Sequence, residues 1–363
     1  MAHRQMNFYA HTLPGVEDIA WLEIRDRLPT ASFNETLFAK DQHGIVSFTY
    51  EGAFDPLFSL RTTEDVFVQL LSVPKLSRSF RDLGEVTQWV GQGEAFGRAI
   101  NNYLRQRRFS GPPTYQLICR KIGKHQYTTH KLTQAVASGL AHRYPKWTAV
   151  PEAAQVEIWA NLLGSHLLLG IRLRDKKRRK QARRQSSVTG GLPPSLAAAM
   201  ILLTEPEPDE LFVDPLCGDY GLLHERRNQV GATAVLVGGD LEQEQLLAAH
   251  QALYRRKRGQ PPLLAQWHTN QWPLKTAVVD KVATILPAKV GDGSKQALTH
   301  FYSHFTAELE RVLRPGGRAI LYTYAYDLLR DSLRPHEGLE LTTGYSITTG
   351  KKWGRIYIIR RIV

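Results

Sequence analysis

The residues best suited to chemistry lie in two neighbouring segments of the C-terminal half. Residues 212–221 read Phe-Val-Asp-Pro-Leu-Cys-Gly-Asp-Tyr-Gly, which predicts a buried strand, a tight glycine-bearing turn and a helix from about Leu222. In a doubly wound α/β domain, such a turn cradles a phosphate or a nucleoside outside the carboxyl ends of parallel strands. Asp240 ends the next predicted strand, where its carboxylate can accept from ribose hydroxyls or cap the following helix.

A second set of candidate residues is basic and forms two clusters. In the first, cations surround Gly123, a residue that lets the backbone approach a phosphate, and its members are Arg120, Lys121, Lys124, His125 and Lys131. The second is a block of like charge at residues 172–184 that includes Lys176, Lys177, Arg178, Arg179 and Lys180. Because so dense a block repels itself unless anions neutralise it, we expect the second cluster to contact phosphates. We expect the first cluster to contact RNA, because its cations surround a glycine in a basic chain. The alternatives are a charged loop beside a strand and a solvated linker.

Residues 212–221 and Asp240 belong to a part of the chain in which predicted strands alternate with predicted helices. Apolar runs predict strands at 211–213, 234–237, 278–285, 319–322 and 356–359, and helices at 196–203, from 222, at 242–254 and at 301–313. This alternation is typical of a mostly parallel sheet with helices on both faces. The last helix is expected to stop at Arg314-Pro315-Gly316-Gly317.

The N-terminal half has a different pattern. Short strands at 44–48, 115–119 and 167–171, with helices at 15–28, 94–107 and 129–144, predict an α+β fold. The length of the chain allows two or three domains. We therefore expect an N-terminal module at 1–70, a second α+β module at 71–175, a basic linker at 176–191 and the α/β domain at 192–363.

Composition narrows the class of partner. The 363 residues carry a formal net charge of +13, which favours a polyanion, and its clustering favours nucleic acid over a membrane surface. No apolar run approaches the roughly 20 residues of a membrane helix, and the first residues lack the apolar core of a signal peptide. The two cysteines, Cys119 and Cys217, predict neither a disulfide framework nor a cysteine zinc site. We expect a cytoplasmic protein without a metal.

Several short segments, taken in their order along the chain, carry a family resemblance. They are residues 13–17, 44–46, 60–62, 120–129, 156–159, 168–173 and 192–197. They resemble the ferredoxin-like module, the THUMP module and the entry to the methyltransferase domain of THUMP-containing RNA methyltransferases, especially the tRNA guanine-N2 methyltransferases of bacteria and archaea. This resemblance covers nearly the whole chain. It implies a Rossmann-like methyltransferase domain preceded by ferredoxin-like and THUMP modules, with tRNA as the partner and S-adenosylmethionine (SAM) as the cofactor.

The resemblance also assigns cofactor residues. The family loop usually reads Asp-Pro-x-Cys/Thr-Gly-Ser-Gly-Thr, and the matching cofactor positions here are Asp214, Pro215, Gly218, Tyr220, Asp240 and His268. Tyr220 replaces a glycine, so its ring can fill the methionine pocket or point to solvent, and its backbone would need a positive φ. His268 stands where the family often has an acid that accepts from the adenine amine.

The methyl-acceptor motif departs furthest from the family. Relatives have Asn/Asp-Pro-Pro-Tyr/Phe/His after the fourth strand, whereas this chain has Ile285, Leu286, Pro287 and Ala288. Ile285 cannot accept a hydrogen bond from the target amine, and Ala288 cannot stack on the base. Losing an oriented acceptor should cost on the order of 10²–10³ in rate.

Two functions remain open at this point. One is a SAM-dependent methyltransferase of a tRNA guanosine with an impaired catalytic site. The other is a catalytically inactive tRNA-binding scaffold, or the partner subunit of an active enzyme. A different, anionic nucleotide held near Lys289 is a third alternative.

Overall fold

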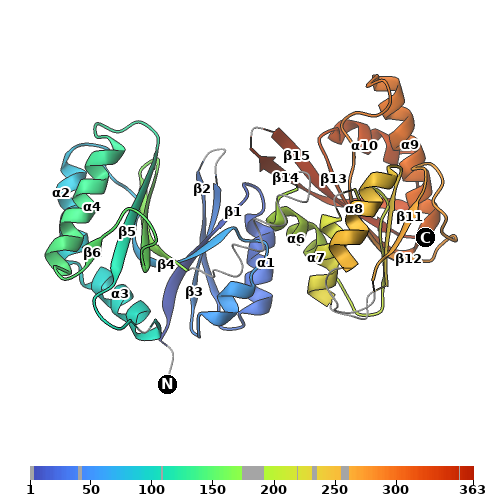
Figure 1. Ribbon diagram of the computed structural model, residues 1–363. Coiled ribbons are helices and arrows are strands. Elements are labelled where there is room, and N and C mark those ends of the chain that lie inside the picture. The colour runs from blue at the N-terminus through green and yellow to red at the C-terminus, as the bar shows by residue number, and fades with distance from the viewer. Residues whose placement is uncertain are drawn as a thin grey trace. The chain divides into compact units, whose positions relative to one another are not determined.

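The chain divides into two units, each with its own β-sheet (Figure 1). One unit comprises Met1–Thr12 and Ala20–Lys176, and the other comprises Leu13–Ile19 and Lys177–Val363. The computed structural model describes residues 4–39, 43–107, 109–173, 192–218, 220–230, 235–254, 261–350 and 352–363. Within these ranges, no helix has the length and apolar character needed to cross a bilayer.

The first unit builds one sheet in the order β2-β3-β1-β4-β8-β7-β5-β6. Its strands are β1 (Met6–Thr12), β2 (Ser32–Ala39), β3 (His43–Tyr50), β4 (Asp65–Val73), β5 (Thr114–Ile122), β6 (Thr148–Ala149), β7 (Val156–Leu163) and β8 (His166–Arg172). Its helical segments are α1 (Glu17–Arg27), which begins in the second unit's segment, η1 (Asp55–Ser59), α2 (Arg81–Gln92), α3 (Glu94–Gln106) and α4 (Thr129–Arg143). The expected boundary between residues 70 and 71 falls inside β4, which pairs with β1 and with β8.

Alternation along the strands separates a helix-covered face from the opposite face. On β1, Phe8 and Ala10 join the large core that includes buried residues of α2, α3 and α4. Tyr9 points the other way and stacks on Phe67 with ring centroids 4.6 Å apart, in a smaller cluster that contains Trp159. Figure 1 shows α2, α3 and α4 along one side of this sheet. The two faces of the first sheet therefore differ: helices cover one, and the other bears the smaller aromatic cluster.

The second unit is a doubly wound α/β domain. Its strands are β9 (Leu211–Asp214), β10 (Val235–Asp240), β11 (Leu263–Gln266), β12 (Val279–Ile285), β13 (Leu313–Thr323), β14 (Leu339–Thr349) and β15 (Lys352–Arg361). They form a sheet in the order β11-β10-β9-β12-β13-β15-β14, in which β15 runs antiparallel to both β13 and β14 and the other pairs are parallel. The order reverses between β9 and β12, so the ligand crevice of this fold lies outside their carboxyl ends.

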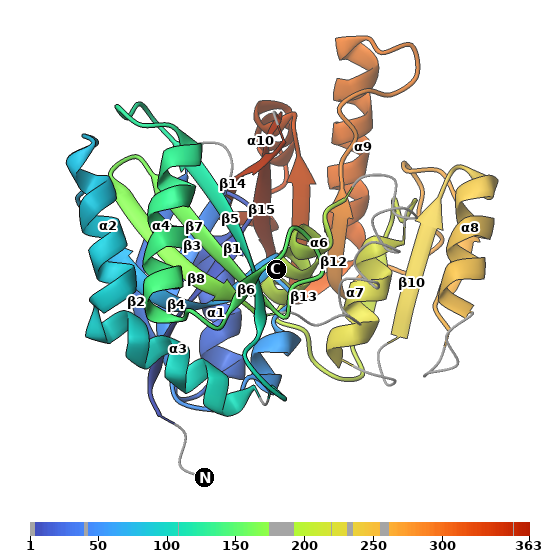
Figure 2. The same ribbon diagram turned by 60° about the vertical axis from the view of Figure 1, so that its left-hand side comes forward.

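Helices cover both faces of this second sheet. They are α6 (Pro194–Leu203), α7 (Gly221–Val230), α8 (Gln243–Tyr254), α9 (Lys295–Val312) and α10 (Tyr326–Leu333). Leu196 of α6 and Leu223 of α7 belong to one apolar cluster, whereas Phe305 of α9 and Leu329 of α10 belong to another (Figure 2). The prediction of a mostly parallel sheet between two helical layers is confirmed.

The segment Leu13–Ile19 belongs with the second unit, although the sequence places it in the N-terminal module. Val16 and Ile19 are fully buried in the apolar cluster that contains α6 and α7 residues. Gly15 has a φ of +93°, and a Cβ there would lie 1.9 Å from the Ser346 carbonyl oxygen. This close approach to β14 requires glycine, and it is a long-range contact that local periodicity does not reveal.

Candidate cofactor site and basic surfaces

Asp214 and Thr284 join the two strands that flank the reversal of strand order. The Thr284 hydroxyl donates to Asp214 Oδ1 at 2.7 Å, and the Leu216 amide donates to the same oxygen at 3.3 Å. Asp214 is buried at the end of β9, and Thr284 is buried near the end of β12. Asp214 therefore shapes the turn after β9.

Asp240 holds the same turn from the end of β10. Its Oδ2 accepts from the Gly218 amide at 2.9 Å, and its Oδ1 accepts from the Glu242 amide at 2.9 Å. Asp240 is only half-buried, and each oxygen retains a lone pair for a further donor. The carboxylate thus bonds the backbone that leads into α8, and it can still accept from ribose hydroxyls.

Tyr220 adopts the backbone conformation that glycine would supply. Its φ is +47°, its amide donates to the Cys217 carbonyl, and its side chain is buried in the apolar cluster that includes α6 and α7 residues. A positive φ costs an ordinary residue about 1–2 kcal/mol, which burial of the ring offsets. The alternative that Tyr220 points to solvent is wrong, because the ring is part of the core.

The loop after β11 packs against the turn after β9. The Trp267 indole N–H donates to the carbonyl of buried Pro215 at 3.1 Å, and a Cβ on Gly239 would lie 1.7 Å from the indole ring. Trp267 is therefore a packing residue. The neighbouring His268 is exposed, and its imidazole makes no hydrogen bond to any described residue, which leaves it available to a ligand.

The loop after β12 is tied to β13. The Leu286 amide donates to the Tyr322 carbonyl at 2.8 Å, and the Tyr302 hydroxyl donates to the Pro287 carbonyl at 3.1 Å. Burial raises the pKa of Tyr302 to about 12, so this hydroxyl keeps its proton at neutral pH. Ala288 is exposed. Of the acceptors in the family motif, the carbonyl of Pro287 is the one retained, and one of its lone pairs is already used.

These residues fit the nucleoside half of SAM. Asp240 offers carboxylate lone pairs at the ribose position, and exposed His268 offers an imidazole that can accept from an adenine amine. Gly218 leaves the turn beside Asp240 free of a side chain, although a Cβ there would make only an ordinary contact, 3.5 Å from Asp240 Oδ2. In the described part of the chain, no group of three or more His, Cys, Asp or Glu side chains is placed to hold a metal ion.

The structure distributes the predicted RNA-binding residues over different surfaces of the first unit. Arg120 lies over the Trp159 ring at 4.4 Å, on the face opposite the helices. Lys131 lies in the first turn of α4, with its Nζ 4.6 Å from the Phe80 ring. Lys124 is exposed in the intervening loop. Arg120 and Lys131 therefore lie on opposite faces of the sheet, and residues 176–180 lie outside the described residues.

His125 fastens the basic loop to the β7–β8 turn. Its Nδ1 lies 3.2 Å from the Gly123 carbonyl, and its Nε2 lies 2.6 Å from the Gly164 carbonyl. Because both partners are acceptors, only the imidazolium form donates to both at once. Lys121 also folds back, with its Nζ 3.4 Å from the Gly123 carbonyl. His125 is thus a positioning residue of the loop, a role that spacing alone does not reveal.

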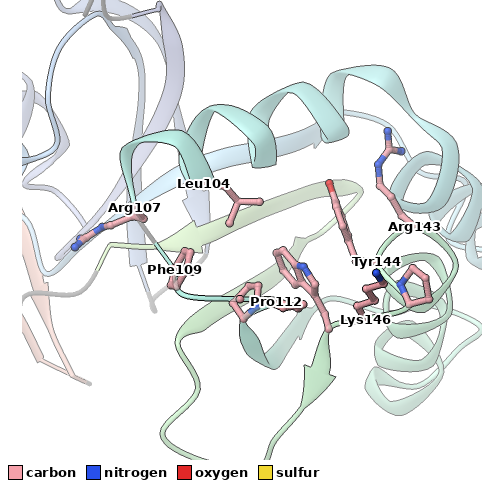
Figure 3. A pocket seen from close by; sticks show the side chains of 11 residues that line it. Leu104, Arg107, Phe109, Pro112, Arg143, Tyr144 and Lys146 are labelled. Carbon is pink, nitrogen blue, oxygen red and sulfur yellow. The ribbon is translucent and has the colours of Figure 1, made fainter.

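A cavity of about 490 Å³ lies at the other end of β5 (Figure 3). Leu104 and Phe109 line one side and Tyr144 and Lys146 the other, and Tyr144 stacks on Trp147 with ring centroids 4.6 Å apart. None of the described residues that line it is acidic. None of these residues is among the candidates from the sequence, although residues 109–113 and 144–147 are rich in aromatic residues and proline.

The known proteins that this chain is similar to include several methyltransferases. Residues 181–343 match the family model described as RMKL-like, methyltransferase domain. A tRNA (guanine(6)-N2)-methyltransferase of Thermus thermophilus is 25% identical over 254 residues, which are 69% of this chain and 74% of that protein. A U6 snRNA (guanine-N(2))-methyltransferase of Bos taurus is 27% identical over 264 residues, covering 72% of this chain and 50% of that protein.

Other relatives are longer than this chain. The tRNA (guanine(6)-N(2))-methyltransferase THUMP3 of Mus musculus is 28% identical over 232 residues, or 61% of this chain, and the match spans 46% of that protein. The chain therefore spans about half the length of its mammalian relatives.

Solved structures confirm the fold over the whole chain. TrmN from Thermus thermophilus has a TM-score of 0.77 at 22% identity, and the match covers 98% of this chain and 100% of that chain. The putative methyltransferase SMU.472, complexed with SAH, has a TM-score of 0.64 at 14% identity and covers 98% of each chain. The fold class predicted from the sequence is confirmed. The chain resembles the guanine-N2 RNA methyltransferases, and its residues 181–343 match the model of the RMKL-like methyltransferase domain.

Proposed function

We propose that this protein binds tRNA and SAM, and that its transfer of a methyl group to a guanosine N2 amine is slow. The observation that carries the proposal is the pair of hydrogen bonds that Asp240 accepts from the Gly218 and Glu242 amides. They fasten the turn after β9 to the end of β10 and leave acceptor lone pairs at the ribose position. The relatives named as guanine-N2 methyltransferases support the reaction type. The THUMP-like first unit would hold the RNA, and a cytoplasmic location is part of the proposal.

The expected rate follows from the loop after β12. SAM, when bound, supplies a methyl group on a positively charged sulfur. The carbonyl of Pro287 can accept one proton of the target amine, and Tyr302 fixes the direction of this carbonyl. Ile285 offers no second acceptor, so the amine is oriented by one hydrogen bond. We therefore expect transfer on the order of 10²–10³ slower than with an oriented side-chain acceptor.

Calorimetric titration of the purified protein with SAM and with S-adenosylhomocysteine tests the cofactor half of the proposal. We expect micromolar binding of both, and at least a tenfold loss in Asp240→Ala, because the carboxylate both holds the turn and faces the ribose. A Glu244→Ala variant, altered nearby on exposed α8, is the control. No binding to the unaltered protein at millimolar ligand would remove SAM from the proposal.

Salt dependence of tRNA affinity tests the RNA half. The double variant Lys121→Ala/Lys124→Ala should bind tRNA more weakly and lower the salt slope by about two, because each lysine that leaves a phosphate lowers it by about one. Lys75→Ala, an exposed lysine elsewhere in the first unit, is the control. An unchanged slope in the double variant would exclude this loop from the RNA interface.

The inactive scaffold is the second candidate function, and the loop Ile285–Ala288 favours it because its side chains carry no acceptor. Transfer of a labelled methyl group from SAM to an unmodified tRNA pool separates the two candidates. Slow transfer supports the first. Tight tRNA binding with no transfer supports the scaffold.

A further inference from the structure

A cavity of about 380 Å³ lies directly beyond the carboxyl end of β13. Its walls include Tyr324 and Tyr326, which follow β13, and Lys295 and Leu298 from the start of α9. Asp327, in the first turn of α10, adds a carboxylate. Neither tyrosine belongs to a segment that matches a family motif in the sequence.

A short chain of hydrogen bonds connects this cavity to the acceptor loop. Tyr302 donates to the Pro287 carbonyl at 3.1 Å, and its oxygen lies 2.6 Å from Thr323 Oγ1. The amide of Ala325, a residue of the cavity wall, donates to the same Thr323 oxygen at 2.9 Å. Two side chains, those of Tyr302 and Thr323, therefore link the Pro287 carbonyl to the Ala325 amide in the cavity wall.

The two rings are held in place before any ligand binds. Tyr324 contacts Tyr322 edge to face, with ring centroids 5.3 Å apart, and its oxygen lies 3.1 Å from Thr349 Oγ1. Tyr326 is 40% exposed, and the Arg355 guanidinium lies 5.2 Å from its ring. The ammonium of Lys352 lies 5.8 Å from the ring of Tyr324. Rings interleaved with cations are the arrangement that binds unstacked bases and their phosphates.

We propose that this cavity receives the target guanine base of the RNA. Tyr324 and Tyr326 supply the stacking surface that Ala288 no longer provides, and Lys352 and Arg355 contact the flanking phosphates. One oxygen of Asp327 accepts from Arg330 at 3.0 Å, and the other can accept from the N1–H on the pairing edge of guanine. This inference rests on the proposed function and names the part of the site that holds its substrate base.

Saturation-transfer NMR with the full chain and guanosine as the probe tests the inference. We expect transfer to the guanine ring in the unaltered protein, and weaker transfer with inosine, which lacks the 2-amino group. Tyr324→Ala and Tyr326→Ala should each weaken guanosine binding about 5–100-fold, since stacking on one ring contributes this much per base. Tyr324→Phe and Tyr326→Phe keep the ring and should bind nearly as well. Equal signals for the Ala and Phe variants, or none for the unaltered protein, would overturn the inference.

Titrations of the same variants with SAM and tRNA separate this inference from the proposed function. If Tyr326→Ala binds SAM and tRNA normally and loses guanosine, the inference is supported. If it keeps guanosine as well, the inference fails while the proposed function stands. If the unaltered protein binds guanosine but neither tRNA nor SAM, the cavity stands and the proposed function fails. Tyr326 is partly exposed, so its replacement is expected to leave the fold intact.

Discussion

Tyr220 occupies a left-handed backbone conformation at the position where relatives keep glycine. Burial of its ring stabilises the folded state, whereas its strained backbone destabilises it. Burial of an aromatic side chain contributes more than the strain removes, since truncating a buried ring costs about 3–5 kcal/mol and the strain about 1–2 kcal/mol. The substitution is thus tolerated because the same residue that strains the turn also fills the core.

We predict that Tyr220→Gly lowers the free energy of unfolding by about 1–4 kcal/mol, the difference between these two effects. The turn keeps its conformation, so SAM affinity should remain unchanged at temperatures where the variant is folded. Denaturant unfolding and calorimetric titration measure the two quantities. Tyr220→Phe, which retains the ring, is the matched control. A large gain in SAM affinity for Tyr220→Gly would show instead that the ring obstructs the cofactor.

Ile285 removes the side-chain acceptor at the end of β12. We predict that Ile285→Asn raises the single-turnover rate of methyl transfer to unmodified tRNA by about tenfold or more, because a second acceptor orients the amine. Ile285→Val keeps the position apolar and should leave the rate unchanged. Equal rates in the two variants would show that another group already provides the missing acceptor.

At the scale of elements, the entry to β9 depends on a buried ion pair. Arg226 of α7 is fully buried and donates to Glu210 Oε2 at 2.6 Å, to the Glu207 carbonyl at 3.1 Å and to Thr204 Oγ1 at 3.2 Å. The ammonium of Lys281 on β12 lies 3.3 Å from the other Glu210 oxygen. Glu210 thus joins α7, β9 and β12 at the end of the sheet opposite the cofactor turn.

This network predicts a dependence of stability on pH. Burial by itself raises the pKa of Glu210, but bonds from the Glu207 amide and Arg226 and the charge of Lys281 lower it below its ordinary value. A lowered pKa in the folded state means that the stabilisation is complete above the ordinary pKa of about 4.3 and is lost as the pH falls through the lowered value.

Glu210→Gln should therefore destabilise the protein by about 3–5 kcal/mol at pH 7, because the charge of Arg226 stays buried without its partner. The variant should also lose part of the acid dependence seen in the unaltered protein. Denaturant unfolding at pH 7 and at a series of lower pH values measures both. Glu94→Gln, from an exposed pair with Arg98, should change little. Parallel pH profiles for Glu210→Gln and the unaltered protein would contradict this account.

At the scale of the whole molecule, helix α1 contributes to two cores. Ile19 is buried in the cluster that contains α6 and α7 residues, whereas Ile24, little more than one turn later, is buried in the core of the first unit. We predict that Ile19→Ala weakens the second unit and Ile24→Ala the first, each by about 2–5 kcal/mol. Hydrogen exchange followed by mass spectrometry distinguishes loss of protection in β9 and β13 from loss in β1 and β3. Loss of protection in the same unit for both variants would contradict the division of the chain.

The sequence predicted most elements whose signal is local. The apolar run before Asp214 and the glycine-bearing turn after it identified β9 and the start of α7, because strand, turn and helix preferences act over a few neighbouring residues. It did not predict β1, β2, β4, β6, β7 or α2 in the first unit, nor β11, β14 or α10 in the second. Leu263 is exposed, most of β14 has exposed side chains and α10 is short, so their apolar patterns are incomplete.

The sequence by itself determined the α/β and α+β halves, the glycine-bearing turn after β9 and the apolar side chain at Ile285, since these depend on residue type and near-neighbour spacing. Tertiary structure alone decided which residues share a site. The bond from Thr284 to Asp214 spans 70 residues, and the one from His125 to Gly164 spans 39. Such bonds form where strand order brings distant segments together, and neither periodicity nor propensity carries that information. The same holds for Tyr324 and Tyr326, which become neighbours of the acceptor loop because β12 pairs with β13.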